Sequence, residues 1–131
     1  RIIFLDLYND FENYINHRNN TSTTRKEDLT HRFYTLMMDN YREHKEVIFY
    51  ADKLHVSSKY LSEVVKETSG KSPKDWIIDY SLLEIKELLK NSSLNIQEIT
   101  IRTKFLNQSA LGRFFKRHTN MSPSEYREST Y

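Results

Sequence analysis

The chain has 131 residues, of which 20 are lysine or arginine and 18 are aspartate or glutamate, so its net charge at neutral pH is +2. It contains no cysteine, which excludes disulfides, thiolate nucleophiles and cysteine metal sites, and no apolar run reaches membrane-spanning length. With only two glycines and two prolines, the chain is expected to be all-α. Its length allows one domain or two very small ones.

The charges are distributed unevenly along the chain. Residues 1–46 carry seven lysines and arginines against eight acids, whereas residues 47–131 carry thirteen against ten. The basic excess therefore lies in the C-terminal part, although it is modest for a nucleic-acid-binding protein. The chain begins with Arg1 rather than methionine and shows no signal-peptide pattern. We expect a fragment of a longer protein that works in a reducing compartment, the cytoplasm.

Residues 2–18 carry apolar and aromatic side chains at helical spacing, which predicts an amphipathic helix. Its apolar side is too large to be left exposed, so it packs either on the core of this chain or on a partner. The polar run at 19–24 detaches this helix and favours a partner, either an upstream sensor domain or a second copy that forms a homodimer. We therefore separate residues 1–28 from the domain that follows.

A second helix is predicted over residues 27–43, with Asp28 or Thr30 as its N-cap. The expected apolar side of this helix consists of Leu29, Phe33, Leu36, Met37 and Tyr41. The pair Met37 and Met38 would suit a soft interaction surface, but core packing is the commoner fate of such a run.

Residues 46–56 predict a short helix with the small residue Ala51, which suits a close crossing with a neighbouring helix. A turn follows, and Ser57 or Ser58 is expected to cap the next helix. The buried side of that helix is predicted to be Leu61, Val64 and Val65. Gly70 suits the left-handed position that ends it.

A long helix is predicted over residues 73–90, with Ser72 as its N-cap and Pro73 at its first position. Its apolar residues are Trp76, Ile77, Tyr80, Leu83, Ile85, Leu88 and Leu89. Because these residues cover much of its circumference, the helix must be covered from more than one side. We expect it to join two small bundles.

The stretch at 96–127 is interpreted as a helix, a turn, a second helix and a short closing helix. The buried side of the second helix is predicted to be Leu111, Phe114 and Phe115. Its opposite side is polar and basic, and no acidic residue lies between Glu98 and Glu125. A helix that is apolar on one side and carries amides and arginine on the other can lie in a DNA major groove.

Residues 46–73 and 95–123 repeat one pattern of small residue, turn, apolar centre and Ser-Pro. The matched positions are Ala51 and Thr100, His55 and Lys104, Leu61 and Leu111, Val65 and Phe115, and Ser72 and Ser122. The second copy is one residue longer between the turn and the helix after it. This spacing is typical of a helix-turn-helix motif, and two copies in tandem are far more specific than one.

On these residues the chain resembles the DNA-binding region of the AraC/XylS family of bacterial transcription regulators. The similarity covers residues 45–128 and rests mainly on Tyr50-Ala51, Gly70-Lys71-Ser72-Pro73, Ile96-x-Glu98-Ile99, Phe115-Lys116 and Ser122-Pro123-x-x-Tyr126-Arg127. The resemblance implies two helix-turn-helix subdomains, at about 46–70 and 95–119, joined by the helix at 73–90 within a domain at 29–128. It also implies that the two units enter successive major grooves on one face of DNA.

Four residues depart from the family pattern. Lys104 and Asn120 stand where the family usually has glycine, Thr100 where it usually has alanine, and Ser81 where it often has arginine. Asparagine tolerates a left-handed backbone, whereas a lysine at position 104 predicts a strained or altered turn. The charge of the Lys104 side chain would compensate by reaching a phosphate.

The resemblance and the outward positions together give candidate DNA contacts. The expected base-reading residues are Lys59, Ser62 and Glu63 in the first unit, and Gln108, Ser109 and Arg113 on a recognition helix at about Asn107–His118. The expected phosphate contacts are Lys53, Ser57, Ser58, Lys66, Lys104, Lys116 and Arg117. Glutamine can pair with adenine, arginine with guanine and glutamate with cytosine. The alternative for each lysine and for Glu63 is a solvated side chain.

The predicted function is sequence-specific binding of double-stranded DNA by a transcription regulator. The alternative is a helical protein-interaction module that binds through residues 2–18 and the Met37–Met38 pair, which weak salt dependence would favour. An enzyme, a cofactor and a metal are not expected, because the histidines show no ligand spacing and no phosphate-binding glycine loop exists. RNA polymerase is left open as a further partner, as is the choice between activation and repression.

Overall fold

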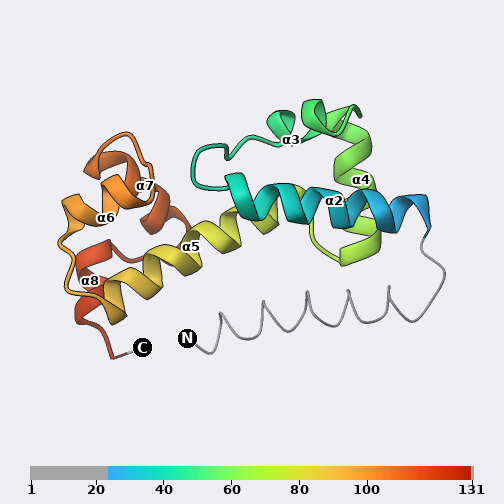
Figure 1. Cartoon of the computed structure of the whole chain (residues 1–131). Coiled ribbons are helices and arrows are strands. Elements are labelled where there is room, and N and C mark those ends of the chain that lie inside the picture. The colour runs from blue at the N-terminus through green and yellow to red at the C-terminus, as the bar shows by residue number, and fades with distance from the viewer. Residues whose placement is uncertain (1–23, 131) are drawn as a thin grey trace. The chain divides into compact units, whose positions relative to one another are not determined.

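The computed structural model of the protein describes residues 24–130, and every regular element in this range is a helix (Figure 1). The helices are α2 (Arg25–Asn40), α3 (Val47–Lys53), α4 (Ser58–Ser69), α5 (Pro73–Asn91), α6 (Ile96–Arg102), α7 (Gln108–Thr119) and α8 (Pro123–Glu128). The expected all-α fold is confirmed. The predicted helix at 2–18 lies outside the described residues, as do the first five positions of the polar run, 19–23.

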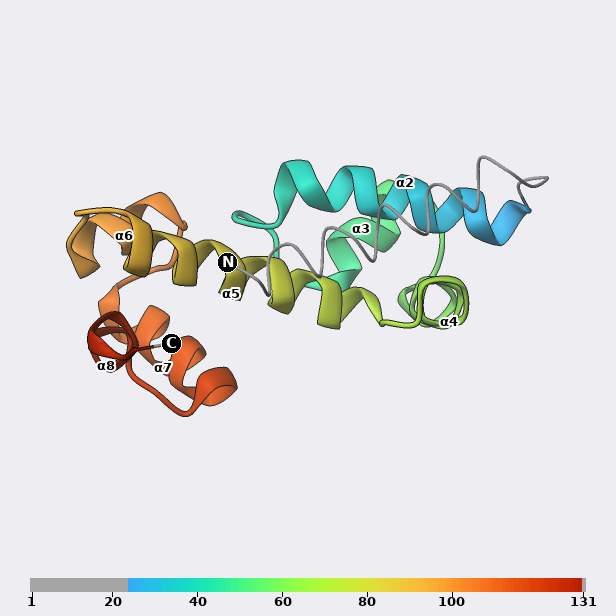
Figure 2. The ribbon, with the colours of Figure 1, turned by 90° about the horizontal axis from the view of Figure 1, so that it is seen from below.

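The chain divides into two compact units between Asp79 and Tyr80, inside α5. The described part of unit 1 contains α2, α3, α4 and the start of α5. Unit 2 contains the rest of α5 together with α6, α7 and α8. Figure 2 shows the same elements from below. Each unit therefore holds one copy of the repeat, and α5 runs through the division, as expected of a linker helix.

Helix α2 begins earlier than the sequence interpretation placed it, because Thr24 rather than Asp28 or Thr30 is its N-cap. The Thr24 hydroxyl accepts a hydrogen bond from the N–H of Glu27 (3.0 Å), and the Glu27 carboxylate accepts one from the N–H of Thr24 (3.0 Å). This reciprocal pair is a capping box, which the assignment of Thr24 to a linker overlooked. Thr30 is instead buried and shares a hydrogen bond with Thr68 of α4.

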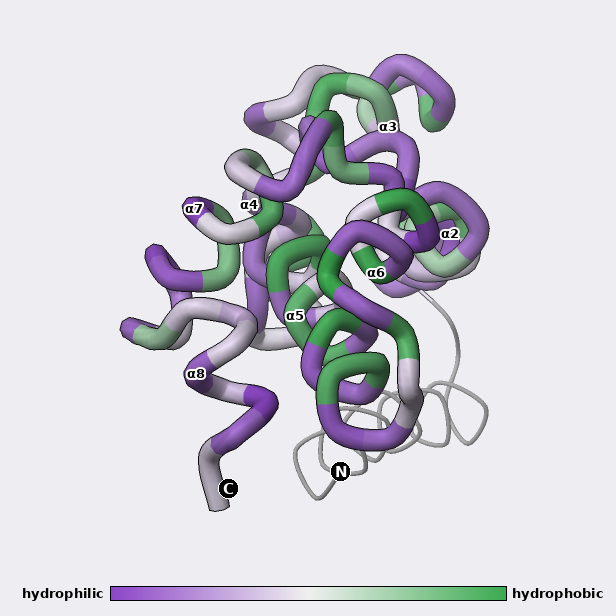
Figure 3. The backbone as a smooth tube through the Cα atoms, turned by 90° about the vertical axis from the view of Figure 1, so that its left-hand side faces the viewer, coloured by the Kyte–Doolittle hydropathy of each residue, from purple (hydrophilic) through white to green (hydrophobic). Residues whose placement is uncertain are grey.

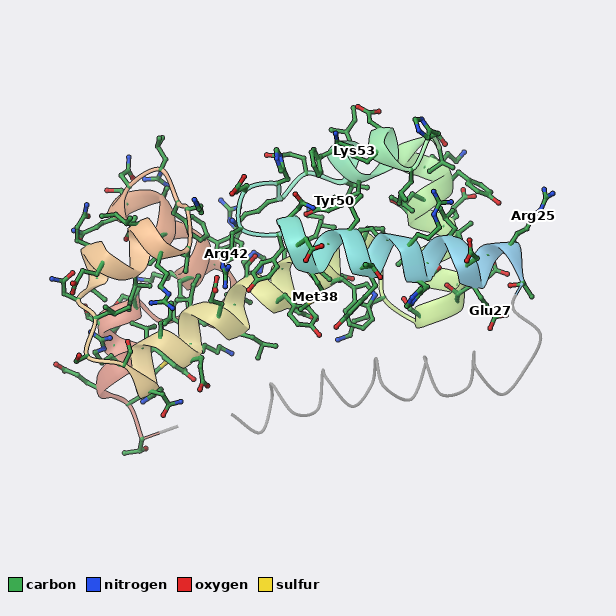
Figure 4. The ribbon with its side chains drawn as sticks, viewed as in Figure 1. Arg25, Glu27, Met38, Arg42, Tyr50 and Lys53 are labelled. Carbon is green, nitrogen blue, oxygen red and sulfur yellow. The ribbon has the colours of Figure 1, made fainter. Side chains whose placement is uncertain are left out.

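The buried side of α2 also differs in part from the expected one. Leu29, Phe33 and Met37 are buried as predicted, whereas Leu36 and Tyr41 are only half-buried. Thr30 and Tyr34 are buried in their place, since α2 packs against α4 through this side. Of the methionine pair, Met37 belongs to the core and Met38 is partly exposed (Figure 4).

Aromatic rings fill the core of unit 1. The Tyr50 ring is fully buried and lies edge-on to Phe33 (centroids 5.5 Å apart) and Phe49 (5.1 Å). Its hydroxyl donates to the carbonyl of His44 (2.6 Å), which satisfies the one polar group that Tyr50 brings into the core. Burial raises the pKa of Tyr50 well above its usual value. Figure 4 labels this side chain.

Unit 2 is built around a smaller core of four aliphatic residues and one phenylalanine. Its fully or nearly buried members are Ile85, Leu89, Ile99, Leu111 and Phe115. Figure 3 shows the corresponding alternation of hydrophobic and hydrophilic segments along α5 and α6. Helix α8 closes this core, because the Tyr126 ring packs against Phe115 (5.4 Å) and Arg127 donates to the carbonyls of Leu88 and Leu89. Among the helices between residues 24 and 130, none is both long and apolar enough to cross a membrane.

Candidate nucleic-acid interface

Helices α3 and α6 end in the same tight turn. In the first unit the N–H of His55 donates to the carbonyl of Asp52 (3.2 Å), and the N–H of Val56 to that of Ala51 (3.0 Å). In the second unit the same two bonds join Lys104 to Ile101 (3.2 Å) and Phe105 to Thr100 (3.2 Å). Both are Schellman motifs, which reverse the chain at the end of a helix with its last carbonyls satisfied. The repeat found in the sequence is thus a repeat of hydrogen bonds.

The residue at the centre of each turn has a left-handed backbone. His55 has φ 59° and Lys104 has φ 64°, although neither is glycine. The strain expected at Lys104 is therefore present, but the turn is not altered, since it matches the one at His55. At the ends of the recognition helices, Gly70 (φ 84°) and Asn120 (φ 63°) take the same left-handed conformation.

A polar side chain caps the start of each recognition helix. The Ser57 hydroxyl accepts from the N–H of Tyr60 (3.0 Å), so Ser57 rather than Ser58 is the N-cap of α4. The Asn107 carbonyl oxygen accepts from the N–H of Ala110 (2.8 Å) at the start of α7. Helix α7 therefore begins at Gln108, one residue later than predicted. The first-turn N–H groups of a helix have no partner within it and suit a phosphate.

Helix α4 is buried on one side and exposed on the other. Leu61, Val64 and Val65 are buried, as predicted. Of the three predicted base-reading residues, Lys59 and Glu63 are exposed and Ser62 is half-buried. They lie along the side of the helix away from its core contacts.

Helix α7 shows the same two-sided arrangement. Leu111 and Phe115 are buried, and Phe114 is half-buried between Phe105 (ring centroids 5.1 Å apart) and His118 (4.9 Å). The predicted contact residues Gln108, Ser109, Arg113, Lys116 and Arg117 are all exposed. A polar and basic surface therefore runs the length of this helix.

The remaining predicted phosphate contacts lie around the two turns and helix starts. Lys53, Ser57, Lys66 and Lys104 are exposed, and Ser58 is half-buried. The Lys53 ammonium also lies 5.7 Å from the centre of the Phe49 ring. A flexible lysine stem can keep such a contact and still offer its charge to a phosphate.

The two recognition helices differ in charge. Helix α7 contains no acidic residue, and Lys116, Arg117 and His118 lie in its last turn. Helix α4 carries Glu63 and Glu67, but Glu67 forms an ion pair with Lys26 of α2 (3.1 Å). The hydrogen bond to Glu67 raises the pKa of Lys26. The more strongly basic surface is thus that of the second unit.

Two residues of this surface, Gln97 and Leu106, were not predicted from the sequence. Gln108 donates through Nε2 to Oε1 of Gln97 on α6 (2.8 Å), so one predicted base reader is already engaged. Leu106, just before the N-cap Asn107, is 90% exposed. The extra residue between turn and helix in the second copy was the available signal for Leu106, while nothing local signalled Gln97. Among residues 24–130 no cluster of acids and histidines could hold a metal ion.

The chain thus holds two copies of one helix-turn-helix. In each copy the first helix buries two adjacent residues, Tyr50 and Ala51 or Ile99 and Thr100, and the second helix is polar and exposed on one side, which defines a helix-turn-helix protein. Residues 50–129 match a family model described as a helix-turn-helix domain. The chain belongs to the AraC/XylS family of transcription regulators.

Relatives and solved structures agree with this assignment. The chain is 32% identical over 77 residues to the transcriptional regulator YobQ of Bacillus subtilis, covering 59% of this chain and 32% of that protein. The C-terminal domain of the response regulator AraT from Geobacillus stearothermophilus has a TM-score of 0.69 at 25% identity, covering 82% of this chain and 93% of that one. The DNA-binding domain of AdpA, solved with a target DNA, shares the fold with a TM-score of 0.64 at 23% identity, over 75% and 88% of the two chains. The chain spans about a third of the length of the curated relatives it matches.

Proposed function

We propose that this chain is the sequence-specific DNA-binding region of a bacterial transcription regulator that works in the cytoplasm. Helices α4 and α7 enter two successive major grooves, each held at its N-terminus by phosphate contacts. The observation that carries this proposal is the twofold occurrence of the same hydrogen-bonded turn before an exposed, polar helix. The family to which the chain belongs supports the same function.

The exposed side chains divide into base readers and phosphate contacts. Gln108 reads adenine and Arg113 reads guanine, because each can form two hydrogen bonds with the major-groove edge of that base. In the first unit, Glu63 accepts from cytosine, with Lys59 beside it. Lysines at the turns and helix ends, such as Lys116, bind phosphates and carry no sequence information.

We also propose a domain at 29–128 that is one part of a longer regulator. The apolar helix predicted at 2–18 then docks on an upstream sensor domain or on a second copy of the chain, and RNA polymerase is a further partner. The protein-interaction alternative loses part of its basis, since Met37 is fully buried and not available to a partner.

Selection of bound duplexes from a random pool at near-physiological salt tests the proposal. We expect two conserved blocks about 10 base pairs apart, one for each recognition helix. Arg113→Ala should weaken binding to the selected site by about 1–3 kcal/mol and relax the preference at one position. Lys116→Ala should weaken all sequences alike and reduce the salt dependence, whereas Lys74→Ala, an exposed lysine of α5, serves as the matched control and should change neither.

A pool in which no sequence is enriched would overturn the proposed function. Enrichment of a single block would restrict sequence reading to one unit, with the other only holding the backbone. An Arg113→Ala variant with unchanged preference and affinity would remove α7 from the role of recognition helix.

A further inference from the structure

The exposed side chains of Gln97 and Gln108 meet across the turn of the second unit. Gln97 is the second residue of α6 and Gln108 the first residue of α7, and Nε2 of Gln108 donates to Oε1 of Gln97 (2.8 Å). We propose that Gln97 is a positioning residue that presents Gln108 to an adenine and contacts the neighbouring phosphate itself. This inference rests on the proposed function.

The hydrogen-bond inventory of Gln108 supports this role. A glutamine carboxamide has two N–H donors and one carbonyl oxygen. Adenine presents an acceptor, N7, and a donor, the N6 amino group, in the major groove, so it occupies the carbonyl oxygen and one N–H. The second N–H is then without a base partner, and Oε1 of Gln97 accepts it. The contact in the free protein is thus compatible with adenine and completes the hydrogen bonds of Gln108.

The position of Gln108 and the restriction of its side chain explain why this contact matters for recognition. Gln108 is exposed at the N-terminal end of α7, the part of a recognition helix that contacts base edges. An exposed glutamine loses rotamer freedom when it binds a base, and a side chain held beforehand loses less. Gln97 is anchored at the start of α6, whose N-cap Asn95 and Glu98 form a capping box. A fixed helix end therefore orients the base reader.

The amide nitrogen of Gln97 gives the pair its second contact. With Oε1 engaged by Gln108, the Nε2 donors of Gln97 suit a phosphate oxygen next to the adenine. In the first unit the corresponding residue of α3 is Ile48, which is 60% exposed and has no hydrogen-bonding side chain. The pair is therefore specific to the second unit, and only its half of the site should show the effect.

Binding measurements on the wild-type selected site test this inference. The tested base pair is the one at which Gln108→Ala abolishes the sequence preference. Duplexes carry adenine, 7-deazaadenine or another base at this position. Their affinities are compared for the wild type, Gln97→Ala, Gln108→Ala and the double variant. We expect Gln97→Ala to reduce the preference for adenine over 7-deazaadenine about tenfold and to have no further effect once Gln108 is alanine. Ile48→Ala is the matched control, and it should leave this preference unchanged.

Gln97→Glu separates positioning from phosphate binding. The glutamate keeps an acceptor for Gln108, so the adenine preference should survive. Its negative charge should repel the phosphate, so binding to all sequences should weaken, most strongly at low salt. A merely structural role of Gln97 would show instead as a lower melting temperature of Gln97→Ala with an unchanged base preference.

Three results would overturn the inference. The first is an unchanged adenine preference in Gln97→Ala. The second is that Gln97→Ala weakens binding equally whether residue 108 is glutamine or alanine. The third is that the base read by Gln108 is not adenine. In each case the wild-type chain still selects a sequence, so the proposed function stands. Failure of the wild type to select any sequence is the separate result that removes both.

Discussion

His55 and Lys104 adopt a backbone conformation that costs a residue with a Cβ about 1–2 kcal/mol. Both occupy the centre of a Schellman turn, where the chain must reverse so that the next helix can start three or four residues later. The packing of the two helices in each unit holds these residues in place against their own preference. The motif therefore imposes a left-handed backbone at this position of each turn, and any residue with a Cβ is strained there.

This strain predicts that His55→Gly stabilises the protein. Glycine takes a left-handed φ without steric cost but has more freedom when unfolded, so we expect a net gain of about 0.5–1 kcal/mol in the free energy of unfolding. Urea denaturation followed by circular dichroism measures it. Lys66→Gly, in the exposed interior of α4, is the control and should lose about 1 kcal/mol. A loss in His55→Gly as large as that of the control would contradict the strain.

Capping of short helices is the decisive feature at the scale of elements. Helix α8 has six residues, too few to be stable alone, yet it closes the core of unit 2. Ser122 accepts from the N–H of Glu125 (3.1 Å), and Glu125 accepts from the N–H of Ser122 (2.8 Å). The hydrogen bonds with Ser122 lower the pKa of Glu125 below its usual value. The folded helix therefore stabilises the charged form of Glu125.

This pKa shift predicts an acid-labile contribution to stability. Because the folded pKa of Glu125 is depressed, its contribution is complete above the unfolded value, near 4.5, and is lost as the pH falls through the folded value. The difference in urea midpoint between wild type and Glu125→Gln should therefore shrink as the pH falls from 6 towards 3. Ser124→Ala, an exposed and uncharged change in α8, should keep the pH dependence of the wild type. A constant difference between wild type and Glu125→Gln at all pH values would refute the assignment.

The whole molecule consists of two units, each with its own core and one copy of the motif. Leu61 and Leu111 are fully buried at matched positions of the repeat, each as the fourth residue of its helix, α4 or α7. Trp76, the single tryptophan, belongs to unit 1, where it lies edge-on to Tyr34 (5.7 Å) and donates to Ser69 (2.9 Å). Its fluorescence therefore reports on unit 1 alone.

This division predicts that matched core changes act on different signals. Leu61→Ala and Leu111→Ala should each lower the free energy of unfolding of the unit that contains them by about 2–5 kcal/mol. Leu61→Ala should shift the urea transition of Trp76 fluorescence, whereas Leu111→Ala should shift part of the helical circular dichroism signal and leave the fluorescence midpoint unchanged. The milder Leu61→Val and Leu111→Val should show the same pattern with smaller shifts. Equal fluorescence shifts in the two alanine variants would mean that the units unfold together.

The helices, the tandem motif and the family can be predicted from the amino-acid sequence, because the signals for them are local. Apolar residues three or four positions apart, serines before helices and the Ser-Pro pairs all act within one or two helical turns. The capping box of Thr24 and Glu27 was equally local and was missed only because a polar run was interpreted as a linker.

Which apolar residues are buried and which polar residues meet depends on how the helices pack, and the sequence did not predict it. Tyr34 rather than Leu36 lies in the core, because the Tyr34 ring packs edge-on against Trp76 of α5. The fold also brings Gln97 to Gln108, which is eleven positions further along the chain, and neither side chain signals this contact in the sequence. The physical reason is that such contacts depend on how separate helices pack, and the periodicity of one helix carries no information about its neighbour.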